Sequence, residues 1–129
     1  MRRVLLDTHA FLWFVFDDPR LSERAAKVIE DPATGKLLSM ACLWEIVIKA
    51  QIGKLSLGME TGEFLGRFVR DRQVEVVPVL LEHLVEYGRL ELHHRDPFDR
   101  LLIAQARILE APIITADQSF ARYDVTAIW

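Results

Sequence analysis

The sequence predicts a single α/β domain in which helices cover both faces of a parallel sheet. Short apolar runs alternate with longer segments of helical periodicity along the whole chain, which is typical of a parallel sheet. The 129 residues suffice for one substantial hydrophobic core. With 51% hydrophobic and 27% charged residues, the composition is that of an ordinary globular protein. We therefore expect one domain over residues 1–129, without repeats or linkers.

The first third of the chain is predicted to contain one strand and two helices. Residues 3–7 form a short apolar run that is expected to be a buried strand. A hydrophobic helix is expected over residues 8–16, because Asp17-Asp18-Pro19 then interrupts the apolar pattern. Ser22 is a suitable N-cap for a second helix, which ends before Asp31-Pro32.

The middle third continues the alternation of strands and helices. A second strand is expected over residues 36–40, followed by a helix over residues 41–52 that Gly53 ends. Residues 60–72 carry their large apolar side chains on one stripe and predict another helix. A third strand is expected over residues 74–77.

The last third adds two helices, two strands and one helical turn. The first helix is expected over residues 80–89. The second is expected over residues 97–109, because proline is favoured at the first position of a helix. Strands are then expected over residues 111–115 and 125–128, with a helical turn at residues 118–121 between them.

Four acidic residues border or interrupt apolar segments, namely Asp7, Glu45, Asp99 and Asp117. The first and last of these follow predicted strands, and the other two lie in the first turns of predicted helices. In open α/β sheets, ligands bind beside the carboxyl ends of the strands, where these acids are expected to meet. Two carboxylates about 4 Å apart repel each other by roughly 4 kcal/mol. A divalent cation offsets such repulsion, so the pattern predicts a metal-dependent hydrolase.

Three of the four acids have a structural alternative that the sequence leaves open. Asp7 and Asp117 are each placed to cap the helical segment that follows them. Glu45 precedes Lys49 by four residues, which is the spacing of an ion pair on a helix surface. The helix around Glu45 is apolar on nearly all sides, however, and offers this carboxylate little exposed surface.

Asp99 is harder to explain by capping alone. In Asp96-Pro97-Phe98-Asp99, the first acid is expected to be the N-cap of the helix. Asp99 shares a stripe with the apolar residues Leu102, Ile103 and Ala106, which is expected to face inward. A buried carboxylate needs a partner, so Asp99 favours the metal site.

Charge and cysteine content set the cellular context. A net charge of −3 gives no electrostatic indication of a nucleic-acid partner. The single Cys42 excludes an internal disulfide and fits a reducing cytosol. Asp7 and His9 interrupt the N-terminal apolar stretch, so we do not expect a signal peptide. The longest apolar run, residues 10–16, is too short to span a membrane, and a cytoplasmic location is expected.

The other reactive side chains are expected to be structural. His93-His94 lacks the neighbouring ligands of a zinc site and is expected in a polar loop. His9 is expected in the core or at its rim, and Cys42 as a small buried residue. The aromatic residues of the first helix are expected mostly in the core; these are Trp13, Phe14 and Phe16. No glycine-rich phosphate loop or Gly-x-Ser-x-Gly motif is present.

The chain resembles a PIN domain of the VapC toxin type from about residue 3 to residue 124. The resemblance rests on four blocks in order, of which the third is the most specific. They are Leu5-Leu6-Asp7-Thr8-His9-Ala10; Leu43-Trp44-Glu45-Ile46 with Lys49 and Gly53-Lys54-Leu55; His94-Arg95-Asp96-Pro97-Phe98-Asp99-Arg100-Leu101-Leu102-Ile103-Ala104-Gln105-Ala106; and Ile114-Thr115-Ala116-Asp117.

The resemblance implies a PIN-like α/β/α sandwich and an endoribonuclease that uses Mg²⁺ or Mn²⁺. It implies that the protein is the toxin of a type II toxin–antitoxin pair. A homodimer is implied, as is a small antitoxin whose tail binds in a groove near the active site. By motif, the family's acidic residues correspond to Asp7, Glu45, Asp99 and Asp117, with Thr115 as a hydroxyl that positions a metal-bound water. Cys42 departs from the family pattern, in which a serine often caps this helix.

The expected reaction is hydrolysis of an RNA phosphodiester by a metal-activated water. Asp7 and Asp99 are our first choices for direct ligands. Contacts to RNA phosphates are expected from the basic residues near the motifs, namely Lys49, Lys54, Arg95 and Arg100. The alternative for Arg100 and Lys49 is that they merely offset the charge of neighbouring acids.

Other function classes fit less well or remain open. A receiver-type signalling domain needs a late lysine, and no lysine follows Lys54. A phosphatase of the Asp-x-Asp type needs an acid where His9 stands. The remaining alternatives are a catalytically inactive PIN-like module that binds RNA or a protein partner, and a housekeeping RNA-processing nuclease.

Overall fold

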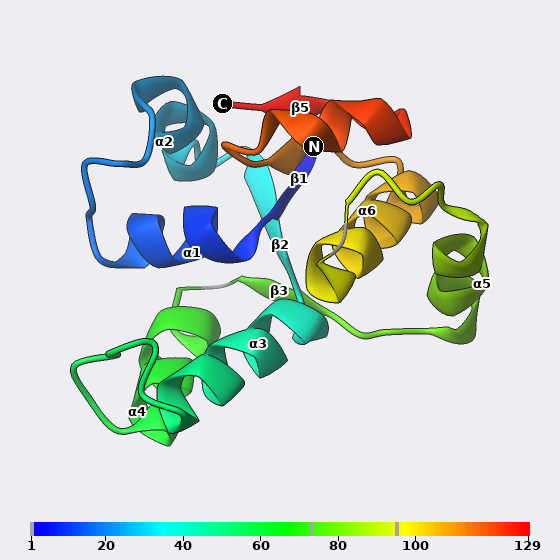
Figure 1. Ribbon diagram of the computed structural model, residues 1–129. Helices are drawn as coiled ribbons and strands as arrows, with labels where there is room; N and C mark the ends of the chain where they lie inside the picture. Colours follow the sequence, from blue (N-terminus) through cyan, green and yellow to red (C-terminus); the bar gives the residue numbers. More distant parts are fainter. Residues whose placement is uncertain (1, 73, 95) are drawn as a thin grey trace.

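The predicted order of strands and helices is confirmed by a computed structural model that describes residues 2–72, 74–94 and 96–129 (Figure 1). The strands are β1 (Arg2–Leu6), β2 (Thr34–Ser39), β3 (Glu75–Val77), β4 (Ile113–Ile114) and β5 (Ala127–Ile128). The α-helices are α1 (Thr8–Val15), α2 (Glu23–Glu30), α3 (Met40–Gln51), α4 (Thr61–Leu65), α5 (Leu81–Arg89) and α6 (Pro97–Leu109). A π-helical segment, η1 (Gly66–Arg70), and a 3₁₀ segment, η2 (Gln118–Tyr123), complete the described elements.

The five strands form one parallel sheet in the order β3-β2-β1-β4-β5. The chain moves outward from β1 to β3 and then returns to place β4 on the other side of β1. The point of reversal therefore lies between β1 and β4, where open α/β sheets bind their ligands. Asp7 directly follows β1, and Asp117 lies three residues beyond the end of β4. The sheet topology alone thus brings two of the predicted acids together.

Helices cover both sides of the sheet, as predicted. Figure 1 shows α1 and α2 on one side of the strands and α5 and α6 on the other. Helix α3 lies below the strands in this view and contacts both α1 and α6. Val4, Leu5 and Leu6 of the central strand are fully buried, as expected for a strand covered on two faces. Within the described residues, no helix combines the length and apolarity needed to cross a membrane.

Helix α3 begins earlier than its sequence suggests. Ser39 is its N-cap, and the Ser39 hydroxyl accepts a hydrogen bond from the backbone N–H of Ala41 (3.1 Å). Cys42 therefore does not cap the helix and is buried inside it, as expected. This start corrects the predicted place of Glu45, which lies in the second turn of α3 rather than the first. Gly53 follows the helix with a positive φ of 80°, a conformation that glycine adopts without strain.

Two other predictions were wrong in detail. The helix expected over residues 60–72 is an α-helix only as far as Leu65 and continues as the π-helical segment η1. The change begins at Gly66, whose φ of −62° and ψ of −46° are still helical, and it lies in the hydrogen-bond register. The N–H of Asp71 accordingly donates to the carbonyl of Gly66, five residues earlier (3.1 Å). Phe16 was expected mostly in the core but is 41% exposed, because it follows the last turn of α1.

Candidate functional site

All four predicted acids line one cavity of about 120 Å³. We call this the acidic cavity; it is lined by Asp7, Thr8, His9, Glu45, Lys49, Asp96, Asp99, Asp117 and Phe120. The acids come from the end of β1, from α3, from the start of α6 and from the segment after β4. Residues more than 100 positions apart in sequence thus share one small site at the carboxyl edge of the sheet.

Asp7 both caps a helix and contributes to the acidic cavity. Its Oδ1 accepts the backbone N–H of Ala10 (2.7 Å), so the capping interpretation is correct. The residue is only 7% exposed. Burial raises the pKa of Asp7, although hydrogen bonds from Thr115 and Ala10 oppose this effect. The ionised form is therefore costly in the absence of further positive charge.

Glu45 is held by two partners. The hydroxyl of Thr8 donates to its Oε1 (2.7 Å), and the ammonium of Lys49 lies 2.9 Å from its Oε2. The predicted ion pair with Lys49 is thus present, but the carboxylate is buried rather than on an exposed helix surface. This bond also raises the pKa of Lys49 and keeps the lysine charged. Lys49 is therefore placed beside the acids, with part of its side chain exposed.

Asp99 is a largely buried carboxyl group that is costly to ionise. Burial is the largest cause that raises its pKa to about 7, and repulsion from Asp96, Asp7 and Glu45 adds to it. Asp96 is the N-cap of α6, as expected, and accepts the N–H groups of Phe98 (2.8 Å) and Asp99 (3.3 Å). Near neutral pH, Asp99 is thus partly protonated, and a bound cation would shift it to the charged form.

His94 belongs to the site, which the sequence did not predict. Its Nε2 lies 2.9 Å from Asp117 Oδ2 and 3.3 Å from Asp99 Oδ2. Each of the three residues offers one ligand atom, and these atoms lie within 4.8 Å of one another. The expectation of a polar loop for His93-His94 was therefore incomplete. The available signal was the position of His94 inside the third motif block, five residues before Asp99.

The hydrogen bonds around His94 define its role. The backbone N–H of Asp96 donates to His94 Nδ1 (3.2 Å), so the neutral ring that fits this pattern carries its proton on Nε2. That N–H then points at the carboxylate of Asp117. The backbone N–H of His94 donates to the hydroxyl of Tyr123 (2.6 Å), which fixes the segment before α6. The bond at Nδ1 fixes the ring, and the bond at Nε2 orients the carboxylate of Asp117.

Asp117 is set by its neighbours in a similar way. Its Oδ1 accepts the backbone N–H of Ser119 (2.9 Å) and the Ser119 hydroxyl (2.6 Å), so it also caps η2. Burial acts to raise the pKa of Asp117, but hydrogen bonds from Ser119 and His94 together lower it. This carboxylate is thus ionised more readily than Asp7 or Asp99.

The auxiliary residues are placed differently from the four acids. Thr115 is buried, and its hydroxyl bonds to Asp7 and accepts the N–H of Asp117 (3.0 Å). Its hydroxyl is therefore used to position two acids. Arg100 lies over the ring of Tyr87, 4.5 Å from its centroid, and is not among the described residues that line the acidic cavity. Arg95 lies outside the described residues.

The donor set of the cavity fits Mg²⁺ or Mn²⁺. Both ions favour oxygen ligands, and the cavity is lined by five carboxylates. Lys49 compensates only the charge of Glu45 by direct contact. Burial raises the pKa of Asp7 and of Asp99, so a bound cation would stabilise the charged form of both groups.

The comparisons with known proteins agree with this architecture. The family model of the PIN domain matches residues 4–125. The fold is similar to VapBC2 from Rickettsia felis bound to a promoter DNA fragment, with a TM-score of 0.74, 15% identity and coverage of 98% of this chain and 97% of that chain. It is also similar to FitAcB from Neisseria gonorrhoeae, with a TM-score of 0.70, 17% identity and coverage of 98% and 96%.

A third similar structure is the toxin–antitoxin system VapBC-5 from Mycobacterium tuberculosis, with a TM-score of 0.66, 20% identity and coverage of 99% and 98%. No curated protein sequence gives a significant match. At these identities the three structures support the fold, whereas the family model identifies the domain over nearly the whole chain. The chain therefore belongs to the PIN domain family.

Proposed function

We propose that this protein is a Mg²⁺- or Mn²⁺-dependent endoribonuclease and the toxin of a type II toxin–antitoxin pair acting in the cytoplasm. The observation that carries the proposal is the convergence of Asp7, Glu45, Asp99 and Asp117 on one small cavity at the reversal point of the sheet. Cleavage of a phosphodiester needs little covalent chemistry from the protein and depends on charge stabilisation and positioning.

Each carboxylate has a defined contribution to such a site. Asp7, Asp99, Asp117 and Glu45 would hold the cation, with the first two as its direct ligands. A cation held there would lower the pKa of water and would stabilise the charge that develops on the leaving oxygen. His94 orients Asp117, and Thr115 joins Asp7 to the backbone of Asp117. Thr8 and Lys49 hold Glu45 in one orientation.

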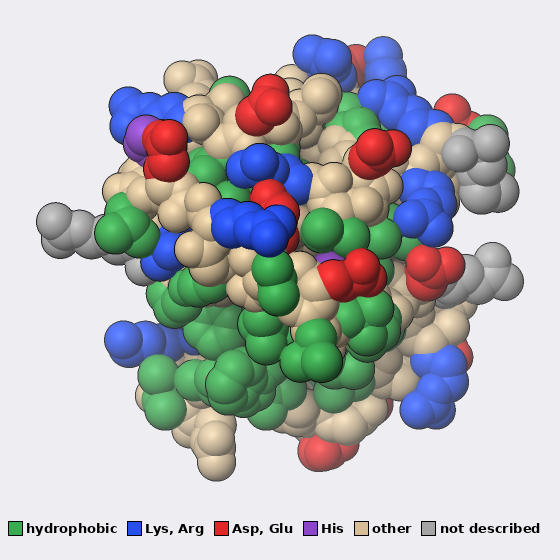
Figure 2. Space-filling view, turned by 90° about the vertical axis from the view of Figure 1, so that its right-hand side faces the viewer, with side chains coloured by type: hydrophobic (Ala, Val, Ile, Leu, Met, Phe, Trp, Pro, Cys, Tyr) green, Lys and Arg blue, Asp and Glu red, His purple; other side chains and the backbone are tan. Residues whose placement is uncertain are grey.

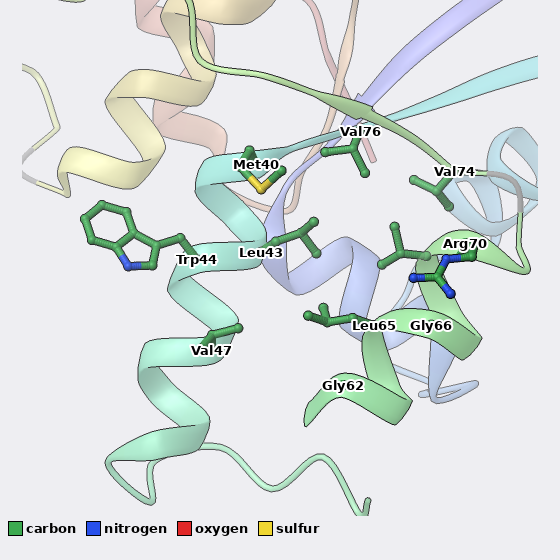
Figure 3. A pocket seen from close by; sticks show the side chains of 11 residues that line it. Met40, Leu43, Trp44, Val47, Gly62, Leu65, Gly66, Arg70, Val74 and Val76 are labelled. Carbon is green, nitrogen blue, oxygen red and sulfur yellow. The ribbon is translucent and has the colours of Figure 1, made fainter. Parts of the chain in front are cut away.

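An apolar groove along α3 is suited to bind a protein partner. Figure 3 shows Leu43 and Val47 of α3 facing Leu65 of α4, with Val74 and Val76 above them in this view. The groove has a volume of about 830 Å³ and is lined mainly by Met40, Leu43, Trp44, Val47, Leu65, Val69, Val74 and Val76. One of the similar structures, VapBC-5, is described as a member of a family of toxin–antitoxin systems. We therefore assign this groove to the apolar segment of an antitoxin.

A second apolar surface supports a homodimer. Figure 2 shows hydrophobic side chains gathered over the lower half of the face that lies on the α5 and α6 side of Figure 1. Leu81, Leu84 and Val85 of α5 are each more than half exposed. Soluble proteins rarely expose large contiguous apolar patches, and such patches mark interaction sites. A second copy of the chain is our proposed occupant.

RNA cleavage by the purified protein tests the enzymatic part of the proposal. Total bacterial RNA incubated with Mg²⁺ or Mn²⁺ is expected to give discrete fragments that are absent with EDTA and with the Asp99→Asn variant. Fragments that persist with Asp99→Asn would overturn the assignment of this residue. Growth arrest on expression tests the toxin assignment independently, and relief of that arrest by a small protein encoded next to this chain would identify the antitoxin.

A further inference from the structure

A mixed aromatic and basic groove adjoins the acidic cavity and has no role in the mechanism above. It has a volume of about 500 Å³. We call it the aromatic groove; the lining residues that matter here are His9, Trp13, Arg20, Lys49 and Lys54. Thr8, His9 and Lys49 line both the aromatic groove and the acidic cavity, so the two spaces are neighbours. A substrate held at the acids therefore has this groove as the next space available to it.

The aromatic groove contains a stacking platform. The rings of His9 and Trp13 are stacked, with centroids 5.5 Å apart and an interplanar angle of 26°. Trp129 packs edge-on against Trp13 at 5.7 Å and supports it from the C-terminal strand. His9 is exposed, so this stack buries little surface for the folded chain alone. An exposed aromatic stack is a surface on which a nucleobase gains affinity whatever its identity.

Basic side chains border the platform. The guanidinium of Arg20 lies over the Trp13 ring, 5.1 Å from its centroid, and is paired with Asp18 at 2.8 Å. Lys54 forms no salt bridge with the described residues, and Lys49 is 39% exposed although it is paired with Glu45. The backbone N–H groups of Lys54 and Leu55 both donate to the carbonyl of Lys49 (2.9 and 3.1 Å), which fixes the turn that carries Lys54. Lys49 and Lys54 are therefore suited to hold phosphates beside a site that is itself acidic.

We propose, on the basis of the ribonuclease function proposed above, that the aromatic groove binds the nucleotide next to the cleaved phosphate in single-stranded RNA. The base lies on the His9–Trp13 stack, and the flanking phosphate lies at Lys49 and Lys54. A paired base has both faces covered by its neighbours in the helix and cannot use the platform. The groove therefore selects unpaired RNA, and stacking makes that selection tolerant of base identity.

Binding of RNA to a non-cleaving parent tests this subsite. The probe is a fluorescein-labelled single-stranded RNA of about 12 mixed nucleotides, titrated with the Asp99→Asn protein in Mn²⁺ and followed by anisotropy. Adding Trp13→Ala is expected to weaken binding at least about tenfold, whereas Trp13→Phe retains most of the affinity. Trp44→Ala is the matched control, because Trp44 is an exposed tryptophan of the other groove. The same RNA annealed to its complement is expected to be insensitive to Trp13→Ala.

Two further measurements keep the result independent of folding defects. RNA is expected to quench the tryptophan fluorescence of the parent and of Trp44→Phe, but to quench that of the folded Trp13→Phe variant far less. Lys54→Ala is expected to lower the slope of log K against log salt by about 0.7, whereas Lys27→Ala on α2 leaves it unchanged. If Lys54→Ala leaves the slope unchanged, Lys54 does not contact a phosphate and that part of the proposal is wrong.

Failure of this subsite differs from failure of the ribonuclease function. If wild-type protein cleaves RNA while Trp13→Ala leaves both affinity and quenching unchanged, the subsite is wrong and the function stands. That result would assign the aromatic groove to a protein partner instead. If the wild-type chain neither binds nor cleaves RNA, both proposals fall.

Discussion

His94 and Asp117 are joined by a hydrogen bond of 2.9 Å between Nε2 and Oδ2, although they lie 23 residues apart in sequence. The bond connects His94, which precedes α6, to Asp117, which follows β4 and lines the acidic cavity. The ring edge of His94 also packs on Phe120. The position of one candidate metal ligand thus depends on a residue that need not bind metal itself.

Replacing His94 separates orientation from coordination. Glutamine places an amide N–H near the position of Nε2, whereas leucine offers no donor. We expect His94→Leu to lower Mn²⁺ affinity and RNA cleavage about tenfold or more, and His94→Gln to retain most of both. Calorimetric Mn²⁺ titration measures the affinity without RNA. Nitrogen coupling to bound Mn²⁺ in electron spin-echo spectra of the wild type would instead make His94 a ligand.

The pH dependence of stability tests whether the pKa values of the buried carboxyl groups are raised. The pKa of Asp99 is raised from 3.8 to about 7 in the folded chain, and that of Asp7 is raised as well. The folded state then binds more protons than the unfolded state, so stability falls as pH rises from about 4 to 7. Denaturant melts in EDTA are expected to show this fall, and Asp99→Asn to reduce it. A free energy of unfolding that rises between pH 4 and pH 7 would contradict the raised pKa of Asp99.

The hydroxyl of Thr8 is expected to matter for folding as well as for the site. It donates to the buried carboxylate of Glu45 at 2.7 Å. A hydrogen bond to a charged group contributes about 1.5–3 kcal/mol, so Thr8→Val should destabilise the chain by that amount. Urea melts measure the change. Thr126→Val serves as the control, because Thr126 is exposed and a similar loss there would point to a general effect of the substitution.

Local patterns in the sequence were sufficient for most of the fold. Ser22 and Asp96 cap helices as predicted, and Asp7 and Asp117 follow strands at the edge where parallel sheets bind ligands. The shared cavity of the four acids follows from that topology. Helix α3 differs because its cap, Ser39, was expected inside a strand, and only the register of β2 against its neighbours decides where the strand ends.

Contacts between distant segments explain what the sequence did not show. His94 joins the site because Tyr123 and Phe120 hold its segment against the acidic cavity, and neither contact has a local signature. Arg100 was expected near RNA phosphates, yet its guanidinium lies over Tyr87 of the preceding helix. Whether it also reaches a substrate stays a prediction, as do the catalytic roles of the four acids.

Metal binding should raise the melting temperature of the folded chain when all the acids of the site are present. A ligand that binds the folded state alone adds about 2.7 kcal/mol at a concentration of 100 times its dissociation constant. Thermal melts with increasing Mn²⁺ are therefore expected to shift upward for the wild type, because the cation stabilises the charged form of Asp99, whose pKa is raised by burial and by repulsion from neighbouring acids. Asp99→Asn is expected to start from a higher melting temperature in EDTA, since it removes a costly carboxylate, and to gain little from Mn²⁺. A variant that gains as much as the wild type would show that Mn²⁺ binds elsewhere on the surface.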